Sequence, residues 1–479
     1  MTTEPHPRAS APQALFSMLT HLAGDADQLD IFSADSCIEG WLAAERALAL
    51  AQGELGLIDP TDAAAIISAA QLSTIDRDAL WVSTKNVGYP ILGLVRQIAA
   101  ALPDGPNGRV HYGATTQDIM DTALALQLQR SMLSLDGRLE ALGDALARQA
   151  ESHAATVMPG RTHAQQAVPT TFGATLATLL GQVTRQRDRL RDALPRVAVI
   201  SMFGAGGTSA AYGPRSIELR GRVAEILGLE NTDVPWHVDR DGLAEYGWLC
   251  ATIAATCAKL ARNIVDLSRT EIGEAFEPYS SHRGASSTMP QKVNPISSEA
   301  IIGLSGVAGA LASSLPRIQE AGHERAAGEW QIEWHVIPQL GLLAGSALSE
   351  AVVIVDGLRV DADRMRANLD LDGGLVMAEA QMIQLADALG REVAHDLVYE
   401  AATRARAQRS ILARTLVDVA AGKGVSHLLP EPLITADDYL GEAKSIVAQS
   451  VRTWNDVNAP RTATIPFADL ATTTEGTPR

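Results

Sequence analysis

The amino-acid sequence predicts an all-α fold built around a long central helical bundle. The chain has 479 residues, of which 46% are hydrophobic and 4% aromatic. An Ala- and Leu-rich composition with few aromatic residues favours packed helices over sheets. Apolar residues also recur at steps of four and three, the spacing that places side chains on one face of a helix. The longest such stripe comprises Leu124, Leu128, Met132, Leu135, Leu139, Leu142 and Leu146.

A second stripe predicts another long helix that faces the bundle interior. It comprises Ile253, Cys257, Leu260, Ile264 and Leu267. The segment from Ala300 to Leu315 mixes Ile and Leu with Gly, Ala and Ser, as expected where helices approach closely on more than one side. We divide the chain into an N-terminal helical domain (1–115), a central helical bundle (116–360) and a C-terminal helical domain (361–479), whose first helix has Asp361 as its N-cap.

The charge of the chain argues against nucleic acid as a partner. A formal net charge of −17 leaves no basic stripe able to displace phosphate counterions. No apolar run approaches the length of a membrane span, and the opening segment, Met1 to Gln13, lacks the apolar stretch of a signal peptide. We therefore expect a cytoplasmic protein without a membrane partner. The three cysteines and the histidines lack metal-ligand spacing, so we expect neither a metal nor another cofactor.

The chemically richest segment is the polar loop from Gly284 to Pro295. On composition alone, a solvated surface loop is an adequate interpretation. Two features favour a functional one: its prolines remove flexibility that a linker would keep, and Lys292 and Asn294 together are suited to binding a carboxylate. A Gly-rich stretch, Phe203 to Tyr212, has no preceding strand and no following Lys-Ser/Thr pair, so we reject it as a phosphate loop.

Two further segments combine hydroxyl, amide and imidazole side chains. Gly113 to Asp118 precedes the longest stripe, and its simplest interpretation is a helix N-cap formed by a threonine or Asp118. A helix N-terminus lined by hydroxyls also binds carboxylates well. Gly160 to Pro169 contains His163, which in isolation would more often be structural or exposed. Histidine suits acid–base work because its usual pKa lies near neutral pH.

These segments resemble the signature motifs of the aspartase/fumarase superfamily. The loop reads Ser-Ser-x-Met-Pro-x-Lys-x-Asn-Pro, the second segment resembles the first substrate-binding turn, and the third reads Gly-Arg-Thr-His. The resemblance implies a three-domain all-α fold, and a mobile loop whose first serine, Ser286, is the base that removes a proton from carbon. It implies His163 as the acid, or partner of the acid, that protonates the leaving group. The substrate-binding residues it implies are Thr115, Thr116, Gln117, Thr162, Ser287, Lys292 and Asn294.

Two more stretches resemble the branch of this superfamily that includes 3-carboxy-cis,cis-muconate cycloisomerase and adenylosuccinate lyase. They are Pro235 to Asp241 and His323 to Trp330. Without the resemblance, Arg240 and Arg325 would be solvated helix charges. With it, both become substrate-carboxylate or structural ion-pair residues near the site, Arg325 being the stronger candidate for the substrate. Whether Lys85 or His237 contacts the substrate stays open at this point.

The resemblance implies a lyase, with alternatives for its substrate. His163 favours elimination, and Ser83 to Gly88 lacks the histidines that an adenylosuccinate lyase usually carries there. We therefore expect β-elimination from a substituted succinate with a small leaving group, such as nitrite (from nitrosuccinate) or an amine, to give fumarate. The alternatives are a 3-carboxy-cis,cis-muconate cycloisomerase and a non-catalytic helical oligomer. The family fold further implies a homotetramer, with each active site shared between subunits and a small dicarboxylate as substrate.

Overall fold

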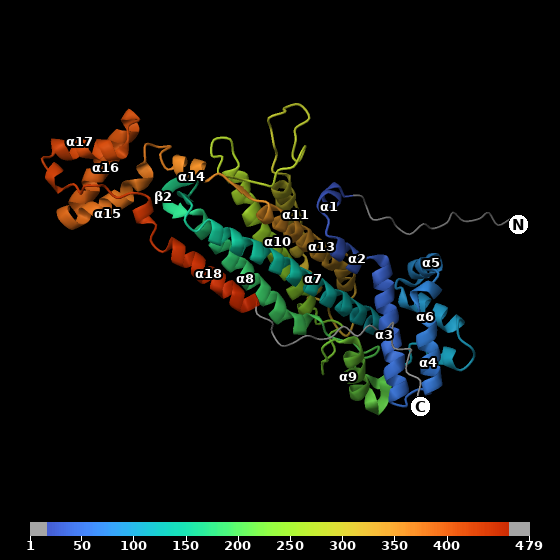
Figure 1. Cartoon of the computed structure of the whole chain (residues 1–479). Helices are drawn as coiled ribbons and strands as arrows, with labels where there is room; N and C mark the ends of the chain where they lie inside the picture. The colour runs from blue at the N-terminus through green and yellow to red at the C-terminus, as the bar shows by residue number, and fades with distance from the viewer. Residues whose placement is uncertain (1–16, 459–479) are drawn as a thin grey trace, which may run out of the picture.

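The computed structural model describes residues 17–458 and confirms the all-α prediction (Figure 1). Met1 to Gln13 lies outside the described residues. The N-terminal helices are α1 (Met18–Leu22), α2 (Ala26–Ile31), α3 (Ala34–Glu54), α4 (Pro60–Ala69), α5 (Arg77–Val87) and α6 (Ile91–Ala100). The central helices are α7 (Thr116–Ser152), α8 (Phe172–Val197), α9 (Ser216–Leu227), α10 (Asp241–Leu267), α11 (Ile296–Ala312), α12 (Leu315–Ile318) and α13 (Glu329–Asp356). The C-terminal helices are α14 (Ala362–Asn368), α15 (Ala378–Leu389), α16 (Arg391–Gln408), α17 (Leu412–Gly422) and α18 (Ala443–Asn458).

Both apolar stripes lie in the core of the central bundle, as the periodicity predicts. In α7 the stripe is fully buried from Leu128 onward, while Leu124 is partly buried. In α10 all five stripe residues are buried and belong to the same hydrophobic core. A helix whose apolar residues share one face is stabilised by burying that face against its neighbours.

Helices α7, α10 and α13 run in the same direction through the bundle. Their first turns are joined by Arg240, which pairs with Asp121 of α7 and Glu333 of α13. At the other end, the Gln149 side chain of α7 donates to the Val355 carbonyl of α13 at 3.1 Å. Loops that precede these helices therefore gather at one end of the bundle, and loops that follow them gather at the other.

Helices α3 to α6 share a second hydrophobic core with the first turns of α7 and with α9. This core joins residues from two separate parts of the sequence, such as Leu42 of α3 and Val223 of α9. Figure 1 shows α3, α4, α6 and α9 together at one end of the bundle. The packing matters for function because it fixes the N-terminus of α7.

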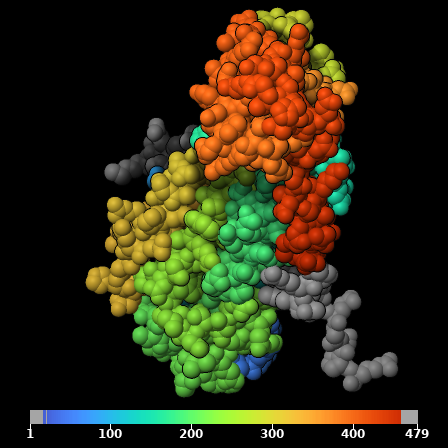
Figure 2. Space-filling view, turned by 90° about the vertical axis from the view of Figure 1, so that its left-hand side faces the viewer, coloured from blue at the N-terminus to red at the C-terminus, as the bar shows by residue number. Residues whose placement is uncertain are grey.

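The C-terminal helices α15 to α17 form a small cluster with a core of its own. Helix α18 instead returns to the bundle, where Trp454 is fully buried and its indole N–H donates to the Asp144 carboxylate at 2.8 Å. Figure 2 shows the orange surface of the C-terminal helices at one end and the red surface of α18 extending along the green surface of the bundle. The C-terminal boundary at residue 361 stays a prediction.

Four short strands interrupt the helical pattern. Strands β1 (Val157–Thr162) and β2 (Gln165–Thr171) form an antiparallel hairpin, and β3 (Ala275–Phe276) pairs with β4 (Arg359–Val360). The sequence indicated only a break near Pro159. The Asp361 side chain accepts a hydrogen bond from the Arg364 backbone, which confirms the predicted N-cap of α14.

Two segments of the described chain are long and apolar enough to cross a membrane, so the expectation that no run reaches this length is wrong. In Glu329–Asp356, which is α13, 61% of the most apolar window is buried, as in the core helix of a bundle. In Ile296–Ile318 the share is 28%. The Ala300 to Leu315 segment therefore packs mainly on one side in the single chain, and residues such as Val307 and Ala310 remain exposed.

Candidate active site

The N-terminus of α7 forms the first part of the site. Thr115 is the N-cap, and the Asp118 carboxylate accepts a hydrogen bond from the Thr115 backbone N–H at 3.1 Å. This confirms the capping interpretation of the sequence. Thr115 and Thr116 are half-buried. Their hydroxyls therefore lie beside the free backbone N–H groups of a 37-residue helix, a position that favours an anion.

Arg325 reaches this helix terminus from the loop before α13. One Nη donates to the Gln117 side-chain oxygen at 2.6 Å. The other donates to the Ala205 carbonyl at 3.0 Å and lies 3.5 Å from the Thr115 hydroxyl. The N–H on Nε donates to no residue between 17 and 458. Arg325 and Thr115, two of the predicted substrate-binding residues, thus lie together at this helix terminus, in a geometry that suits one carboxylate.

Gln117, which was predicted to bind substrate, is buried beside Arg325. It is 1% exposed, its amide nitrogen donates to the His237 carbonyl at 2.8 Å, and its oxygen accepts from Arg325. Both ends of the amide are therefore engaged within the chain. Gln117 therefore holds Arg325, and its own contact with a substrate stays a prediction.

Arg240 lies in a buried ion pair, which is the second of the two roles that the sequence left open for it. Its guanidinium is 2% exposed and donates through Nε and both Nη atoms to Asp121, Glu333 and the Trp236 carbonyl. All five N–H groups are used in this way. Burial opposes the charge of Arg240, but the two carboxylates outweigh it and raise the pKa of the guanidinium. Arg240 therefore joins α7, α10 and α13 and has no N–H left for a substrate.

The loop that carries Ser286 is a closed hairpin between α10 and α11. The Asn294 backbone N–H donates to the Gly284 carbonyl at 2.8 Å, and Ala285 bridges to Val293. Gly284 has a positive φ of 68°, and a Cβ atom there would lie 2.3 Å from the Asn294 carbonyl oxygen. This position therefore requires glycine.

Ser286 lies just inside the closed base of this hairpin. Its hydroxyl oxygen accepts hydrogen bonds from the backbone N–H groups of Thr288, at 3.3 Å, and Met289, at 3.2 Å. Two amide donors aimed at one oxygen stabilise negative charge on it. Serine is a weak base without such help, so this arrangement favours the function that the sequence predicts for Ser286.

The other predicted loop residues lie in the same hairpin as Ser286 and do not contact the predicted site residues outside it. Ser287 and Lys292 are exposed, and Asn294 is half-buried at the base of the hairpin. Glu277 anchors the loop by accepting from the backbone N–H groups of Ser297 and Ser298 at the start of α11. The position of the hairpin is therefore fixed at its base, while its side chains face solvent in the single chain.

His163 and Thr162 lie at the tip of the β1–β2 hairpin. Both are exposed, and His163 and Ala164 have positive φ angles of 51° and 62°. A two-residue hairpin turn of type I′ has positive φ at both central positions, so a histidine and an alanine here replace the usual Asn and Gly. Arg161 pairs with the buried Glu274 through two hydrogen bonds of 2.9 and 2.6 Å. This pair fixes the hairpin to the segment after α10.

The predicted site residues lie at two opposite ends of the helical bundle in one chain. Thr115 and Arg325 precede α7 and α13, whereas Ser286 follows α10 and His163 follows α7. Helix α10 has 27 residues and is therefore about 40 Å long at 1.5 Å per residue. Figure 1 shows the loop between α10 and α11 projecting from the end of the bundle that lies away from α3 and α9. A single chain therefore does not bring Ser286 and Arg325 together.

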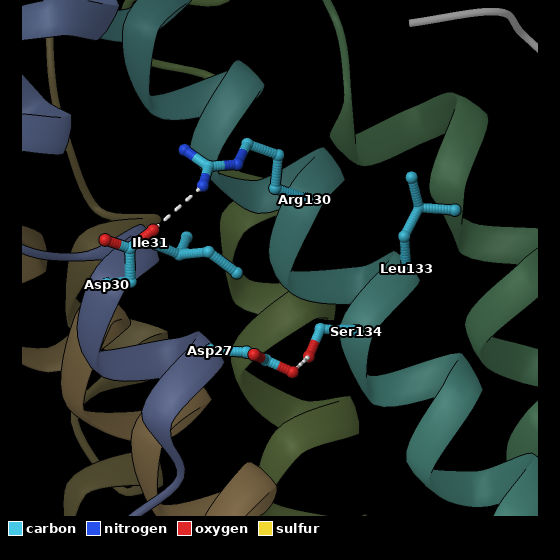
Figure 3. Close-up of a pocket in the computed structure, with 6 residues that line it drawn as sticks. All are labelled: Asp27, Asp30, Ile31, Arg130, Leu133 and Ser134. Carbon is cyan, nitrogen blue, oxygen red and sulfur yellow. Dashed lines mark hydrogen bonds and ion pairs between the residues drawn. The ribbon is translucent and has the colours of Figure 1, made fainter.

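No predicted site residue lines the hollow of about 430 Å³ between α2 and α7 (Figure 3). Figure 3 shows Arg130 bonded to Asp30 and Ser134 bonded to Asp27 across it. Lys85 is exposed in the last turn of α5. Within residues 17–458, no group of three or more His, Cys, Asp or Glu side chains is arranged to hold a metal ion.

Comparisons with known proteins show which family the chain resembles. The model of the lyase family matches residues 30–309, and that of the adenylosuccinate lyase C-terminus matches residues 374–450. The chain is 40% identical to 3-carboxy-cis,cis-muconate cycloisomerase of Pseudomonas aeruginosa, over 88% of this chain and 93% of the relative. It is 37% identical to nitrosuccinate lyase of Streptomyces davaonensis, over 86% of this chain and 90% of the relative.

A solved structure shows the same fold. The 3-carboxy-cis,cis-muconate lactonizing enzyme of Pseudomonas putida superposes with a TM-score of 0.85 at 37% identity, covering 92% of this chain and all of that one. The chain belongs to the aspartase/fumarase superfamily. Within it, the chain lies in the branch of 3-carboxy-cis,cis-muconate cycloisomerase and adenylosuccinate lyase. It is an enzyme, and the interpretation as a non-catalytic helical oligomer is set aside.

Two residues of this superfamily member have roles that the sequence did not indicate. Asp118 was seen as a possible helix cap, yet its carboxylate also accepts from Tyr212 and from the His237 ring. His237, left open above, is buried, and its Nδ1 has no hydrogen-bond partner within residues 17–458. No local sequence signal predicts these contacts, because the partners are 94 and 119 positions from Asp118.

Proposed function

We propose that this enzyme catalyses β-elimination from a substituted succinate to give fumarate. Ser286, as its oxyanion, takes a proton from the carbon next to one carboxylate. The electron pair of that C–H bond forms the C=C bond of fumarate, and the group on the neighbouring carbon departs with its own bonding pair. The observation that carries the proposal is the pair of backbone N–H groups on the Ser286 oxygen, because they stabilise the oxyanion that a serine base requires. Without such donors, too little of the serine is ionised at neutral pH for it to remove a proton from carbon.

Removal of the proton places a second negative charge on the adjacent carboxylate in the transition state. In this proposal Lys292, Ser287 and Asn294 of the hairpin loop bind that carboxylate. Thr115, Thr116 and Arg325 bind the other end of the succinate at the α7 terminus. Cationic and amide donors that are already in place lower the barrier more than donors that must rearrange during the reaction.

His163, with Thr162 beside it, is proposed to assist the leaving group. Its exposed position at a hairpin tip allows it to reach a substrate bound between chains. An amine needs a proton to leave, whereas nitrite leaves readily as an anion. The dependence of the rate on His163 therefore differs between these leaving groups. The relative named nitrosuccinate lyase supports nitrosuccinate as a substrate to test.

We further propose a homotetramer in which each active site combines residues of different chains. Two observations support it: Ser286 and Arg325 lie at opposite ends of a bundle whose helix α10 is about 40 Å long, and α11 leaves apolar residues such as Val307 exposed. Pairing these faces between copies would bury them. The proposed tetramer is cytoplasmic, needs no cofactor, and has no nucleic-acid or membrane partner.

The test is an assay for newly formed fumarate by its ultraviolet absorbance. Purified wild-type enzyme is supplied in turn with nitrosuccinate, aspartate and adenylosuccinate. The same assays are then repeated with the variant Ser286→Ala. We expect fumarate from one substrate and its loss in the variant. Ser281→Ala is the matched control, since Ser281 is exposed in the same loop outside the motif. Absence of fumarate with every substrate would overturn the proposal.

A second candidate function is 3-carboxy-cis,cis-muconate cycloisomerase. The 40% identity to the Pseudomonas aeruginosa enzyme of that name favours it. The same loop would then act on the ring-forming step of a tricarboxylate, and no fumarate would appear. Turnover of 3-carboxy-cis,cis-muconate, measured as the loss of its absorbance, distinguishes the two functions.

A further inference from the structure

Asp118 is the most highly coordinated carboxylate near the α7 terminus. It is fully buried. Its two oxygens accept from Phe203 N at 2.9 Å, Gly204 N at 2.9 Å, Thr115 N at 3.1 Å, Tyr212 Oη at 3.1 Å and His237 Nε2 at 2.9 Å. These donors come from four separate parts of the chain. An ionised carboxylate only accepts hydrogen bonds, which suits a set of five donors.

The phenol among these donors is held in its protonated form. Burial raises the pKa of Tyr212 well above its usual value, and the charge of Asp118 raises it further. Tyr212 therefore remains a donor at any pH at which an enzyme works. Its ring also lies against Gly113, where a Cβ atom would be 2.8 Å from it. The turn that leads into α7 is packed directly on this cluster.

Each of the contacts that hold Arg325 leads back to Asp118. The Gln117 amide binds Arg325 and is oriented by the His237 carbonyl, while the His237 ring is bound to Asp118. The Ala205 carbonyl that binds Arg325 follows directly after Gly204, whose N–H donates to Asp118.

The third route runs through the helix cap. The Thr115 hydroxyl lies 3.5 Å from Arg325, and the Thr115 backbone N–H donates to Asp118. Asp118 itself makes no contact with Arg325, and it is too deeply buried to touch a substrate. Its influence on a bound carboxylate therefore passes through the three groups that bind the guanidinium.

We propose that Asp118 is the positioning residue that fixes Arg325 for binding the substrate carboxylate. It does so by tying the α7 N-terminus, the Phe203–Gly204 turn and the His237 segment into one rigid frame. This inference rests on the proposed function only for the identity of the ligand as a dicarboxylate. The frame itself is a property of the chain.

The test compares Asp118→Asn with Asp136→Asn. Asparagine keeps the shape of Asp118 but replaces one acceptor oxygen by a donor that faces other donors. Asp136 is the matched control because it lies on the same helix about 27 Å away and accepts from Arg187 and Arg191. We expect Asp118→Asn to raise KM for the dicarboxylate by about tenfold or more, with a much smaller change in kcat. Asp136→Asn should leave KM unchanged.

A second readout does not depend on activity. Amide hydrogen exchange is measured in residues 321–328, which do not contact Asp118 but carry Arg325. We expect faster exchange there in Asp118→Asn and wild-type exchange in Asp136→Asn. If wild type releases no fumarate while Asp118→Asn still shows faster exchange, the proposed function fails and the frame stands. Wild-type exchange in Asp118→Asn would overturn the inference, whatever the activity.

Tyr212→Phe covers the case in which Asp118→Asn does not fold. This variant removes one donor and leaves the carboxylate in place. We expect a smaller rise in KM and a smaller rise in exchange at 321–328 than in Asp118→Asn. Exchange and KM both equal to wild type in Tyr212→Phe, together with a misfolded Asp118→Asn, would also overturn the inference, because the buried charge would then act on folding alone.

Discussion

The side-chain amide of Gln117 holds the guanidinium of Arg325 at 2.6 Å, across 208 positions of sequence. Because the Gln117 nitrogen donates to the His237 carbonyl, its oxygen is the end that faces Arg325. This contact turns the guanidinium so that its remaining N–H groups are available beside the Thr115 hydroxyl. The arginine that we propose to bind the substrate carboxylate is thereby oriented by Gln117, which the sequence had suggested as a ligand of the substrate.

Replacing Arg325 by alanine should weaken substrate binding. We expect KM to rise on the order of 10- to 100-fold, since a hydrogen bond to a charged group contributes about 1.5–3 kcal/mol. Lysine should restore part of the affinity, because it keeps the charge without the fork of donors. Steady-state kinetics measure both. Arg317→Ala is the control, since Arg317 is exposed nearby and pairs with Glu320. Equal KM values in all variants would contradict the assignment.

Mixed assemblies of two impaired variants should recover activity when the substrate concentration is far below the raised KM of Arg325→Ala. In Ser286→Ala chains the base is missing, and in Arg325→Ala chains the carboxylate-binding group is weakened. If a site takes these residues from different chains, random mixing restores about a quarter of the sites. Co-refolding the two variants at equal concentration and assaying the product measures this. The chain carrying both substitutions provides the baseline. No recovery in a mixed oligomer shown by mass spectrometry would argue that one chain supplies both residues.

The substitution Gly284→Ala should disable the catalytic loop with little effect on the bundle. The new Cβ atom would lie 2.3 Å from the Asn294 carbonyl oxygen, so the hairpin cannot close as it does now. A displacement of about 1 Å at a catalytic group can lower kcat on the order of 100-fold. Gly424→Ala is the control: Gly424 also has positive φ, but no atom lies within 4 Å of the added Cβ. Similar kcat values in the two variants would contradict the role of this loop closure.

Glu333 should make stability depend on pH. Burial, together with the charge of Asp121, outweighs the attraction of Arg240 and raises the pKa of Glu333 from 4.5 to about 7. A group whose pKa is higher in the folded than in the unfolded state contributes to the free energy of unfolding. This contribution is fully present below the unfolded pKa and is lost as pH rises through the folded pKa. Glu333→Gln keeps an uncharged side chain at every pH.

Urea unfolding of wild type and Glu333→Gln at about pH 5 and about pH 8 measures this effect. As pH rises, the free energy of unfolding of wild type should fall relative to that of Glu333→Gln by up to about 3 kcal/mol. Glu329→Gln, four residues earlier on the same helix and outside the ion pairs, should show no such shift relative to wild type. A pH-independent difference for Glu333→Gln would mean that Glu333 stays ionised between its partners.

Much of the fold was predictable from the sequence because its signals are local. The stripe from Leu128 to Leu146 has the period of a helix, so its burial in the bundle followed from the spacing. The cap at Asp361 and the cap at Thr115 were likewise readable from a few adjacent residues. The β1–β2 hairpin was not, because its turn uses His163 and Ala164 where a hairpin usually has Asn and Gly.

By itself, the sequence determined the helical class, the three motif segments and the chemical groups they carry. Periodicity, caps and loop composition depend on neighbours within a few residues, which a sequence displays directly. The tertiary structure decided that Arg240 pairs with Asp121 and Glu333. It also decided that Gln117 binds Arg325, and that Ser286 and Arg325 lie at opposite ends of the helical bundle in one chain. Such relationships depend on which helices pack together and in which direction, and charge or hydroxyl content alone does not specify either.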